Sequence, residues 1–341
     1  MALIACVFAA GWAVAAGPSS QFQVSGAVTA PKTYTLTDLE ARPAITQTIS
    51  FGSGSGPQTH VYTGASLWGV LDAGDIVTNP AIKNDVLNKY VLATGSDGYR
   101  VVFSLSELNP NFGNRPDLVA YSETSNGAST PLTGDGFART TAPGDVKGGR
   151  YVSNLVDLDV RSSGSTQSST GGGTSTQFSV TGAVTSPMSF DLGALKGLTT
   201  LTETFGGHTY TGVSFWELLS STVGIDLNPA VKNDVLGKYV VATGSDGYKS
   251  LFSLGELSTA FGNQPDLIAY DVDGVGLGNN GFARLVVPND VKMGRWVSNL
   301  VNLQVFSATA VPEPQTYALM LVGLFAIGTA AKRRQATPRQ P

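Results

Sequence analysis

The sequence predicts an α+β chain built from two tandem β-rich domains with short helices. Segments such as Phe22–Val28 alternate apolar and polar side chains, which is typical of half-buried strands. Residues 80–121 align without gaps to 229–270, and 30 of those 42 positions are identical. The repeat has the length of a domain, so we interpret the body as one domain present twice and not as a solenoid.

The expected elements of the first copy alternate between strands and helical turns. Thr37–Leu39 predicts an N-capped short helix that ends before Pro43. Ser66–Leu71 and its counterpart Ser214–Leu219 predict capped helical turns, and Asp97-Gly98 predicts a tight turn between two strands. The further expected strands are Tyr90–Thr94, Tyr99–Phe103, Leu118–Tyr121 and Phe137–Ala142.

Composition places the boundaries between the two copies. We assign residues 17–161 to repeat 1 and residues 177–310 to repeat 2. Residues 162–176 between them are rich in Ser, Gly and Thr and contain no large apolar residue. Such a segment behaves as a flexible coil. We therefore expect each repeat to fold alone, and the two to reorient freely unless their surfaces bind each other.

The N-terminal segment 1–16 is predicted to be a signal peptide. Its apolar run is about the length of a signal-peptide core and is short for a membrane span. Ala13-Val14-Ala15 supplies a small-x-small cleavage pattern, while Leu3-Ile4-Ala5-Cys6 also fits a lipoprotein box.

The C-terminal segment 311–341 contains three parts in a characteristic order. A short motif precedes an apolar run at 317–331, which is followed by the basic cluster Lys332-Arg333-Arg334. The motif consists of Val311, Pro312, Glu313 and Pro314. This order resembles the PEP-CTERM sorting signal of Gram-negative bacteria.

The resemblance implies an exosortase-type membrane protease as partner and cleavage near the Pro-Glu-Pro motif. It also implies that 317–331 is a transmembrane segment that anchors the chain transiently in the inner membrane, with the basic cluster on the cytoplasmic side. A plain C-terminal anchor is the alternative. Both interpretations place the body outside the cytoplasm, in the periplasm, on the outer membrane surface or in the extracellular matrix.

Charge and cysteine content exclude several function classes. Residues 21–310 carry 17 Lys and Arg against 24 Asp and Glu, so the body lacks the basic excess of a general nucleic-acid binder. The single Cys is Cys6. The body therefore has no disulfide, no thiolate metal ligand and no cysteine nucleophile.

Five short motifs occur in the same order in both repeats. In repeat 2 they are Tyr210–Ser214, Ser245–Tyr248, Leu267–Tyr270, Gly281–Pro288 and Lys292–Arg295. Through these motifs each repeat is similar to the molybdopterin-binding domain of the sulfite oxidase family. The resemblance implies the fold of that domain for both copies.

In that family a molybdenum ion is held by a pterin dithiolene and by one protein Cys. The Cys would fall near Ser50-Phe51 and Thr204-Phe205, where neither repeat has one. Because oxygen and nitrogen ligands replace a soft thiolate poorly, we expect no cofactor and no oxotransferase activity. Molybdopterin is implied by the resemblance alone.

The family also holds its pterin phosphate with basic residues. The resemblance assigns this anion-binding role to Arg139, Lys147, Arg150, Arg284, Lys292 and Arg295. The alternative is that these bases pair with the nearby Asp145 and Asp290 and merely fix a loop. The two histidines, His60 and His208, occupy equivalent positions and are further candidates for a ligand contact or a proton switch. One His per repeat is too few for a zinc site, so no metal ligands are predicted.

These observations favour an exported, exosortase-processed surface or matrix protein with two non-catalytic binding or structural domains. A secreted molybdopterin-dependent oxidoreductase is one alternative. A binder of an anionic small molecule or an exopolysaccharide is another.

The sorting signal makes a direct prediction. Replacing Pro312, Glu313 and Pro314 by alanine should trap a longer, membrane-bound form, because the protease would lack its recognition motif. Immunoblotting of membrane and surface fractions with C-terminal mass analysis reports this. Surface protein that still contains Arg339 would contradict the hypothesis.

Overall fold

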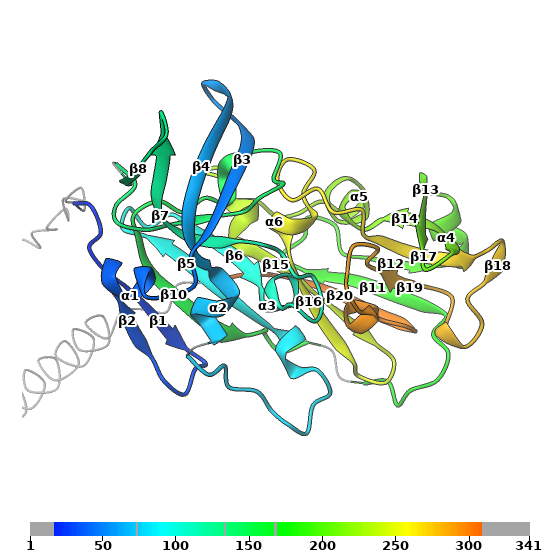
Figure 1. Cartoon of the computed structure of the whole chain (residues 1–341). Coiled ribbons are helices and arrows are strands. Elements are labelled where there is room, and N and C mark those ends of the chain that lie inside the picture. The colour runs from blue at the N-terminus through cyan, green and yellow to red at the C-terminus, as the bar shows by residue number, and fades with distance from the viewer. Residues whose placement is uncertain (1–16, 73, 133, 167–168, 309–341) are drawn as a thin grey trace, which may run out of the picture. The chain divides into compact units, whose positions relative to one another are not determined.

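The computed structural model describes residues 17–72, 74–132, 134–166 and 169–308 (Figure 1). The predicted signal peptide, the sorting motif Val311–Pro314 and the predicted transmembrane segment 317–331 lie outside these residues. Within the described part of the chain, no helix is long and apolar enough to cross a membrane.

Each repeat contains two mixed or antiparallel sheets with the same strand order. In repeat 1 the first sheet has the order β2 (Lys32–Tyr34), β1 (Phe22–Gly26), β10 (Leu155–Ser162), β5 (Lys89–Gly95) and β6 (Arg100–Ser104). The second has the order β3 (Ile45–Ser53), β4 (Gly56–Ser66), β7 (Leu118–Ser125) and β8 (Ala128–Pro131), with β9 (Arg139–Thr141) also on β7.

Repeat 2 has the corresponding two sheets. The first is β12 (Met188–Asp191), β11 (Gln177–Gly182), β20 (Leu300–Ser307), β15 (Lys238–Gly244) and β16 (Lys249–Ser253). The second is β13 (Thr200–Phe205), β14 (His208–Ser214), β17 (Leu267–Val272) and β18 (Val275–Gly276), with β19 (Arg284–Val286) on β17. In the first sheets β1 pairs with β10, and β11 with β20, in parallel; the other pairs are antiparallel.

The helices are short, which confirms the β-rich α+β class. They are α1 (Leu36–Glu40), α2 (Leu67–Asp72), α3 (Leu105–Leu108), α4 (Leu192–Lys196), α5 (Phe215–Glu217) and α6 (Leu254–Leu257). A π-helical turn at Leu218–Val223 continues α5. Single 3-10 turns lie at Asp85–Asn88, Gly148–Arg150, Asp234–Gly237, Gly278–Asn280 and Met293–Arg295.

Local sequence signals explain where the helices begin. Ser66 and Ser214 precede α2 and α5, and each hydroxyl accepts a hydrogen bond from the backbone three residues on. The cap of α1 is Thr35 and not Thr37. Asp38 accepts from the Thr35 amide in a capping box, which settles the start of this helix.

Each hydrophobic core combines both sheets of a repeat. In repeat 1, Val24 and Val91 of the first sheet belong to the same buried cluster as Tyr62 and Val119 of the second. This cluster also includes Phe261 of repeat 2. The two cores therefore meet at the boundary between the repeats.

The two repeats bind each other through reciprocal contacts. Ser104 Oγ donates to Glu256 Oε2 at 2.8 Å, and its counterpart Ser253 Oγ donates to Glu107 Oε1 at 3.2 Å. The Val146 amide donates to the Phe261 carbonyl, and Val291 donates to Phe112 in the same way. Because each contact has an equivalent from the other repeat, the two repeats bind through the same surface patch, as the subunits of a two-fold dimer do.

This interface is the exception that the sequence prediction allows, in which the repeats do not reorient freely because their surfaces bind each other. Both repeats belong to one compact unit that ends at Ser307. Part of the linker is also bound, since Ser169 Oγ and the Thr170 amide donate to the Ser245 carbonyl at 2.8 and 3.0 Å. The composition of residues 162–176 identifies them as a linker. It cannot reveal that the surfaces of the two repeats are complementary to each other.

The shared interface predicts one cooperative unfolding transition for both repeats, instead of two independent ones. Urea unfolding can be followed by hydrogen exchange with mass spectrometry, using peptides from β5 and β15 as matched probes. We expect coincident midpoints. Separate midpoints for the two strands would show that the repeats fold independently despite their contact.

Candidate functional site

Arg150 lies at the centre of a buried ion-pair network in repeat 1. Its Nε and Nη2 donate to both oxygens of Asp145 at 2.8 and 2.7 Å, and its Nη1 donates to Glu107 Oε2 at 2.8 Å. The Arg150 side chain is 3% exposed. A bidentate guanidinium–carboxylate pair of this kind is a strong charge-assisted contact.

Repeat 2 contains the same network around Arg295. This guanidinium donates to both oxygens of Asp290 and to Glu256 Oε1, and its side chain is 2% exposed. The structure therefore corrects the assignment of Arg150 and Arg295 to an anion site. Their donors are used by carboxylates of the chain, as in the loop-fixing alternative, and solvent does not reach them.

Carboxylates outnumber guanidiniums in this buried region. Asp117 and Asp266 are each 1% exposed, and neither has a hydrogen-bond partner at its carboxyl oxygens. Burial raises the pKa of Asp117 to about 8, despite the opposing charge of Arg150. Burial likewise raises the pKa of Asp266 to about 7. Asp117 is therefore largely protonated in the folded protein at neutral pH, whereas Asp266 is about half protonated.

The two glutamates lie nearest to the boundary between the repeats. Each accepts from the Ser of the opposite repeat, as described above. Burial raises the pKa of Glu256 well above its usual range, and the neighbouring Glu107 contributes to the rise. Arg295 opposes this shift. The boundary thus combines buried ion pairs with hydrogen bonds that cross from one repeat to the other.

Arg139 and Arg284 occupy equivalent positions with different partners. Arg139 Nη1 donates to Asp135 Oδ2 at 2.6 Å and to Tyr62 Oη at 3.2 Å. Four residues before Arg284 the chain has Asn280, whose amide oxygen accepts from Ser298 Oγ. Among the described residues, Arg284 has no carboxylate within ion-pairing distance.

The Arg284 guanidinium instead lies over the indole of Trp296, 4.8 Å from the ring centroid. Its Nε is buried without a hydrogen-bond partner. Burial lowers the pKa of Arg284, because no anion offsets the loss of solvent around the charge. The residue as a whole remains partly exposed.

The remaining predicted residues are dispersed. Lys147 and Lys292 are exposed, and Lys292 Nζ donates to Asn111 Oδ1 of repeat 1 at 2.8 Å. His60 Nδ1 lies 2.6 Å from Glu123 Oε1, and the ring stacks between Phe51 and Tyr62.

His208 Nδ1 lies 2.6 Å from Asp273 Oδ2 at the exposed end of β14. This hydrogen bond lowers the pKa of Asp273. Each His therefore has a carboxylate partner in its own repeat. In the described part of the chain, no group of three or more His, Cys, Asp or Glu residues is placed to hold a metal ion.

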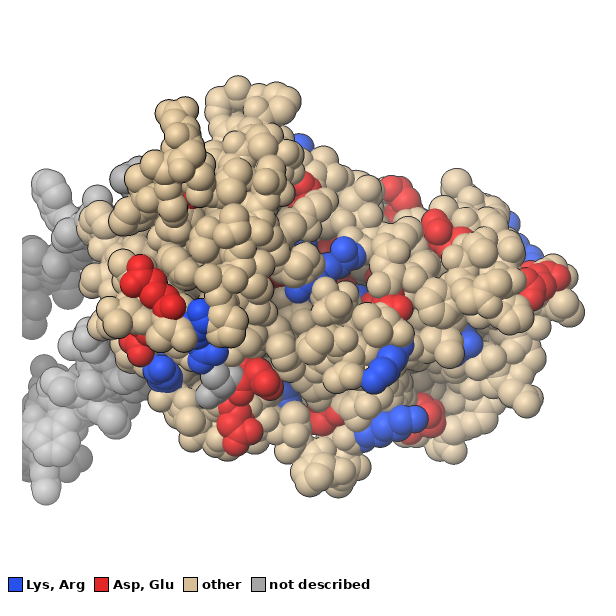
Figure 2. Space-filling view, viewed as in Figure 1, with Lys and Arg blue, Asp and Glu red and all other residues tan. Residues whose placement is uncertain are grey.

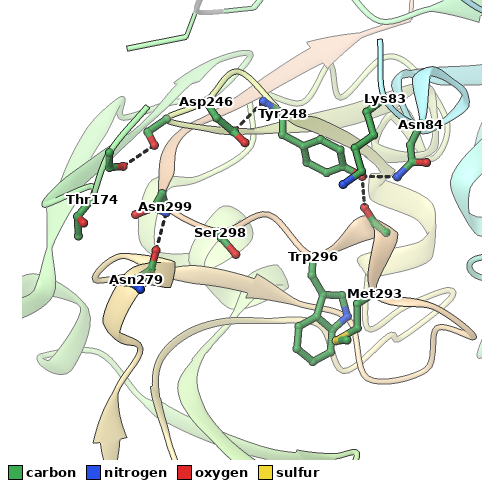
Figure 3. A pocket seen from close by; sticks show the side chains of 13 residues that line it. Lys83, Asn84, Thr174, Asp246, Tyr248, Asn279, Met293, Trp296, Ser298 and Asn299 are labelled. Carbon is green, nitrogen blue, oxygen red and sulfur yellow. Dashed lines mark hydrogen bonds between the residues drawn. The ribbon is translucent and has the colours of Figure 1, made fainter. Parts of the chain in front are cut away.

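A pocket of about 530 Å³ opens where repeat 1, the linker and repeat 2 meet (Figure 3). Lys83 and Asn84 of repeat 1 lie beside Tyr248 of repeat 2 in its wall, which also includes Trp296. Asn84 Nδ2 donates to Tyr248 Oη at 2.9 Å, and Asn233 donates to Tyr99 in the same way on the other side of the interface. This pocket was not expected from the sequence, since its walls come from distant segments.

The residues present do not fit a molybdenum cofactor. The place where the family's Cys would lie is occupied in repeat 1 by Phe51, which packs edge-on against Tyr151 with ring centroids 4.5 Å apart. In repeat 2 it is occupied by Phe205, 5.0 Å from the Trp296 ring. No sulfur donor is available at either place, and Arg150 and Arg295 are already paired.

Sequence reasoning missed Glu107, Glu256, Asp117 and Asp266, which share one buried region with the two arginines. A signal for the two glutamates was present in the repeat, because Ser104-Leu105-Ser106-Glu107 returns as Ser253-Leu254-Gly255-Glu256. It predicts a capping box, and the structure contains one at Ser104. The contact across the repeats could not be inferred from that local pattern.

Comparison with known proteins gives limited similarity. No protein-family model matches the chain, and no curated protein matches it. Among solved structures, the chain is similar to the sulfane dehydrogenase SoxCD from Paracoccus pantotrophus. The two are 14% identical, the match covers 82% of this chain and 77% of that chain, and the TM-score is 0.34.

The buried carboxyls predict that stability falls as pH rises. The folded state keeps protons on Asp117 and Asp266 that the unfolded chain releases near pH 4. Their contribution is therefore complete below about pH 4 and is lost as pH rises towards about 8. Each carboxyl lowers the free energy of unfolding by about 1.4 kcal/mol per pH unit within its window.

Asp117→Asn imitates the protonated carboxyl and should flatten this dependence in urea unfolding measured from about pH 5 to about pH 8. Asp226→Asn, at an exposed position, is the control. An unchanged pH slope in Asp117→Asn would contradict the assignment.

Proposed function

We propose that the chain is an exported, exosortase-processed surface or matrix protein whose body is a non-catalytic module that binds an anion through Arg284. Both repeats are proposed to be variants of the sulfite oxidase-type molybdopterin-binding domain. In this proposal they retain the fold and have lost the cofactor.

The proposal rests on a difference between the repeats: Asp135 of repeat 1 corresponds to Asn280 of repeat 2. In repeat 1 the carboxylate of Asp135 neutralises Arg139 at 2.6 Å. In repeat 2 the equivalent guanidinium has no carboxylate within ion-pairing distance among the described residues, and burial lowers its pKa. An external carboxylate or phosphate would supply the missing negative charge and two or more charge-assisted hydrogen bonds.

Export and the absence of catalysis are supported by the sequence. The two terminal segments resemble targeting signals, and the low charge content is common in secreted proteins. Cys6 lies within the predicted signal peptide, so the mature chain would have no thiolate for molybdenum. The alternative, a secreted molybdopterin-dependent oxidoreductase, would require a metal ligand of another kind.

Two classes of ligand share the required chemistry. A small phosphorylated or carboxylated molecule would place one anionic group at Arg284. An acidic exopolysaccharide would offer a carboxylate on successive sugars, which suits a protein retained in a surface matrix. Titration with inorganic phosphate and with an oligogalacturonate distinguishes these sources.

Substitutions that exchange Asp and Asn between the equivalent positions 135 and 280 test anion binding in both repeats. Asn280→Asp recreates in repeat 2 the pair seen in repeat 1, so it should weaken anion binding at least about tenfold, as should Arg284→Ala. Asp135→Asn should expose Arg139 and add a second site. Isothermal titration calorimetry at low salt measures both, because screening weakens such contacts.

Arg139→Ala is the control that should leave the affinity unchanged, since this residue is already neutralised. Binding that survives in both Asn280→Asp and Arg284→Ala would place the ligand elsewhere. Binding that falls equally in Arg139→Ala would contradict the distinction between the repeats.

A further inference from the structure

Strand β3 is a sheet edge that lacks the protection found at other edges. It pairs with β4 in one unbroken register from Ile45 to Ser53. None of its nine residues is charged or a proline, and Ile, Thr and Phe favour extended structure. A long, regular and uncharged edge of this kind presents free backbone groups to another strand.

Other edges in the described residues are guarded. Pro31 precedes β2, Pro187 precedes β12, and β8 contains Pro131. Strand β18 has two residues, while β6 and β16 contact each other between the repeats. The counterpart of β3 in repeat 2, β13, is shorter and contains Glu203. Proline, charge and short length each discourage edge pairing, so β3 is the exception.

The register shows which backbone groups are available. Gly52 directs its amide away from β4 and donates to the Val146 carbonyl at 2.8 Å. Since the direction alternates along a strand, the amides and carbonyls of Thr46, Thr48 and Ser50 also point away from β4. The structure gives these groups no partner among the described residues.

The side chains of the same residues form an uncharged outer face. Thr46, Thr48 and Ser50 are exposed, and cross-strand hydroxyl pairs join Thr46 to Thr63 and Ser50 to Thr59 at 2.8 Å. Ile49 lies on the opposite face and is buried. Neither β3 nor β4 contains a charged residue, and Figure 2 shows the surface of the projecting hairpin almost free of charge.

We propose that β3 pairs antiparallel with β3 of a second copy of this chain. A two-fold axis at Thr48 would place Thr48 opposite its own counterpart and Thr46 opposite Ser50. The three outward positions would then exchange backbone hydrogen bonds in both directions, and no like charges would meet. The hydroxyl rows of each sheet would continue into the next.

Self-complementarity favours a second copy over an unrelated peptide as the occupant. The Val146–Lys147 segment already covers the edge beside Gly52 and limits pairing to the stretch before it. Because only repeat 1 offers this edge, pairing closes at a dimer and does not propagate into a fibre. This surface is distinct from the interface between the repeats.

A single engineered cysteine tests the pairing in the full chain. In a Cys6→Ser background, Thr48→Cys would be the only thiol. The two-fold arrangement brings the two Thr48 Cα atoms about 5.5 Å apart, which suits a disulfide. We expect oxidised glutathione, as electron acceptor, to convert this variant to a covalent dimer. Thr204→Cys, at the equivalent place in β13, should stay monomeric.

Sedimentation equilibrium without crosslinking provides the second measurement. Wild-type chain should show twice the monomer mass at high concentration, and Thr48→Pro should raise the dissociation constant at least about tenfold. Proline is tolerated at an edge where the amide faces solvent, and unchanged thermal unfolding checks the fold. A monomeric wild type, or equal crosslinking through Thr204→Cys, would overturn the proposal.

Discussion

The pairing of Arg150 and Arg295 with carboxylates is the interaction on which the arrangement of the two repeats depends. Each guanidinium is bound by an aspartate and a glutamate of its own repeat, and that glutamate accepts from a serine of the other repeat. Removing one member would leave a buried charge without its partner, at a cost of about 3–5 kcal/mol. Since buried ion pairs add little net stability over apolar packing, we infer that this network chiefly determines how the repeats align.

The same network explains why a resemblance to a cofactor-binding domain need not imply the cofactor. Two of the arginines that the resemblance assigns to an anion, Arg150 and Arg295, are buried and paired with carboxylates of the chain. The repeats differ beside the other arginine pair, where Asn280 of repeat 2 stands in place of Asp135 and Arg284 has no carboxylate within ion-pairing distance among the described residues. A repeated domain allows such a difference, because one copy can keep the arginine–aspartate ion pair while the other copy has an arginine without a carboxylate partner.

Much of the fold could be predicted because its signals are local. The Asp97-Gly98 turn and the strands on either side follow from turn chemistry and alternation, and β5 and β6 lie where expected. Arg150 lies five residues after Asp145, and the sequence allows either an ion pair between them or an anion-binding role for Arg150. The structure contains the ion pair. The contact from Ser104 to Glu256 spans the chain, so no local pattern could indicate it. The role of Asn280 could not be predicted either, because the ion pair between Arg139 and Asp135 in repeat 1 is visible only in the folded chain.

The central claim is that the basic residues of this fold stabilise the protein or bind an anion, and do not hold molybdenum. Elemental analysis with native mass spectrometry of the protein purified from its own host tests this most directly. Our account predicts molybdenum far below stoichiometric amounts and no bound pterin. Stoichiometric molybdenum would contradict the account and restore the oxidoreductase hypothesis.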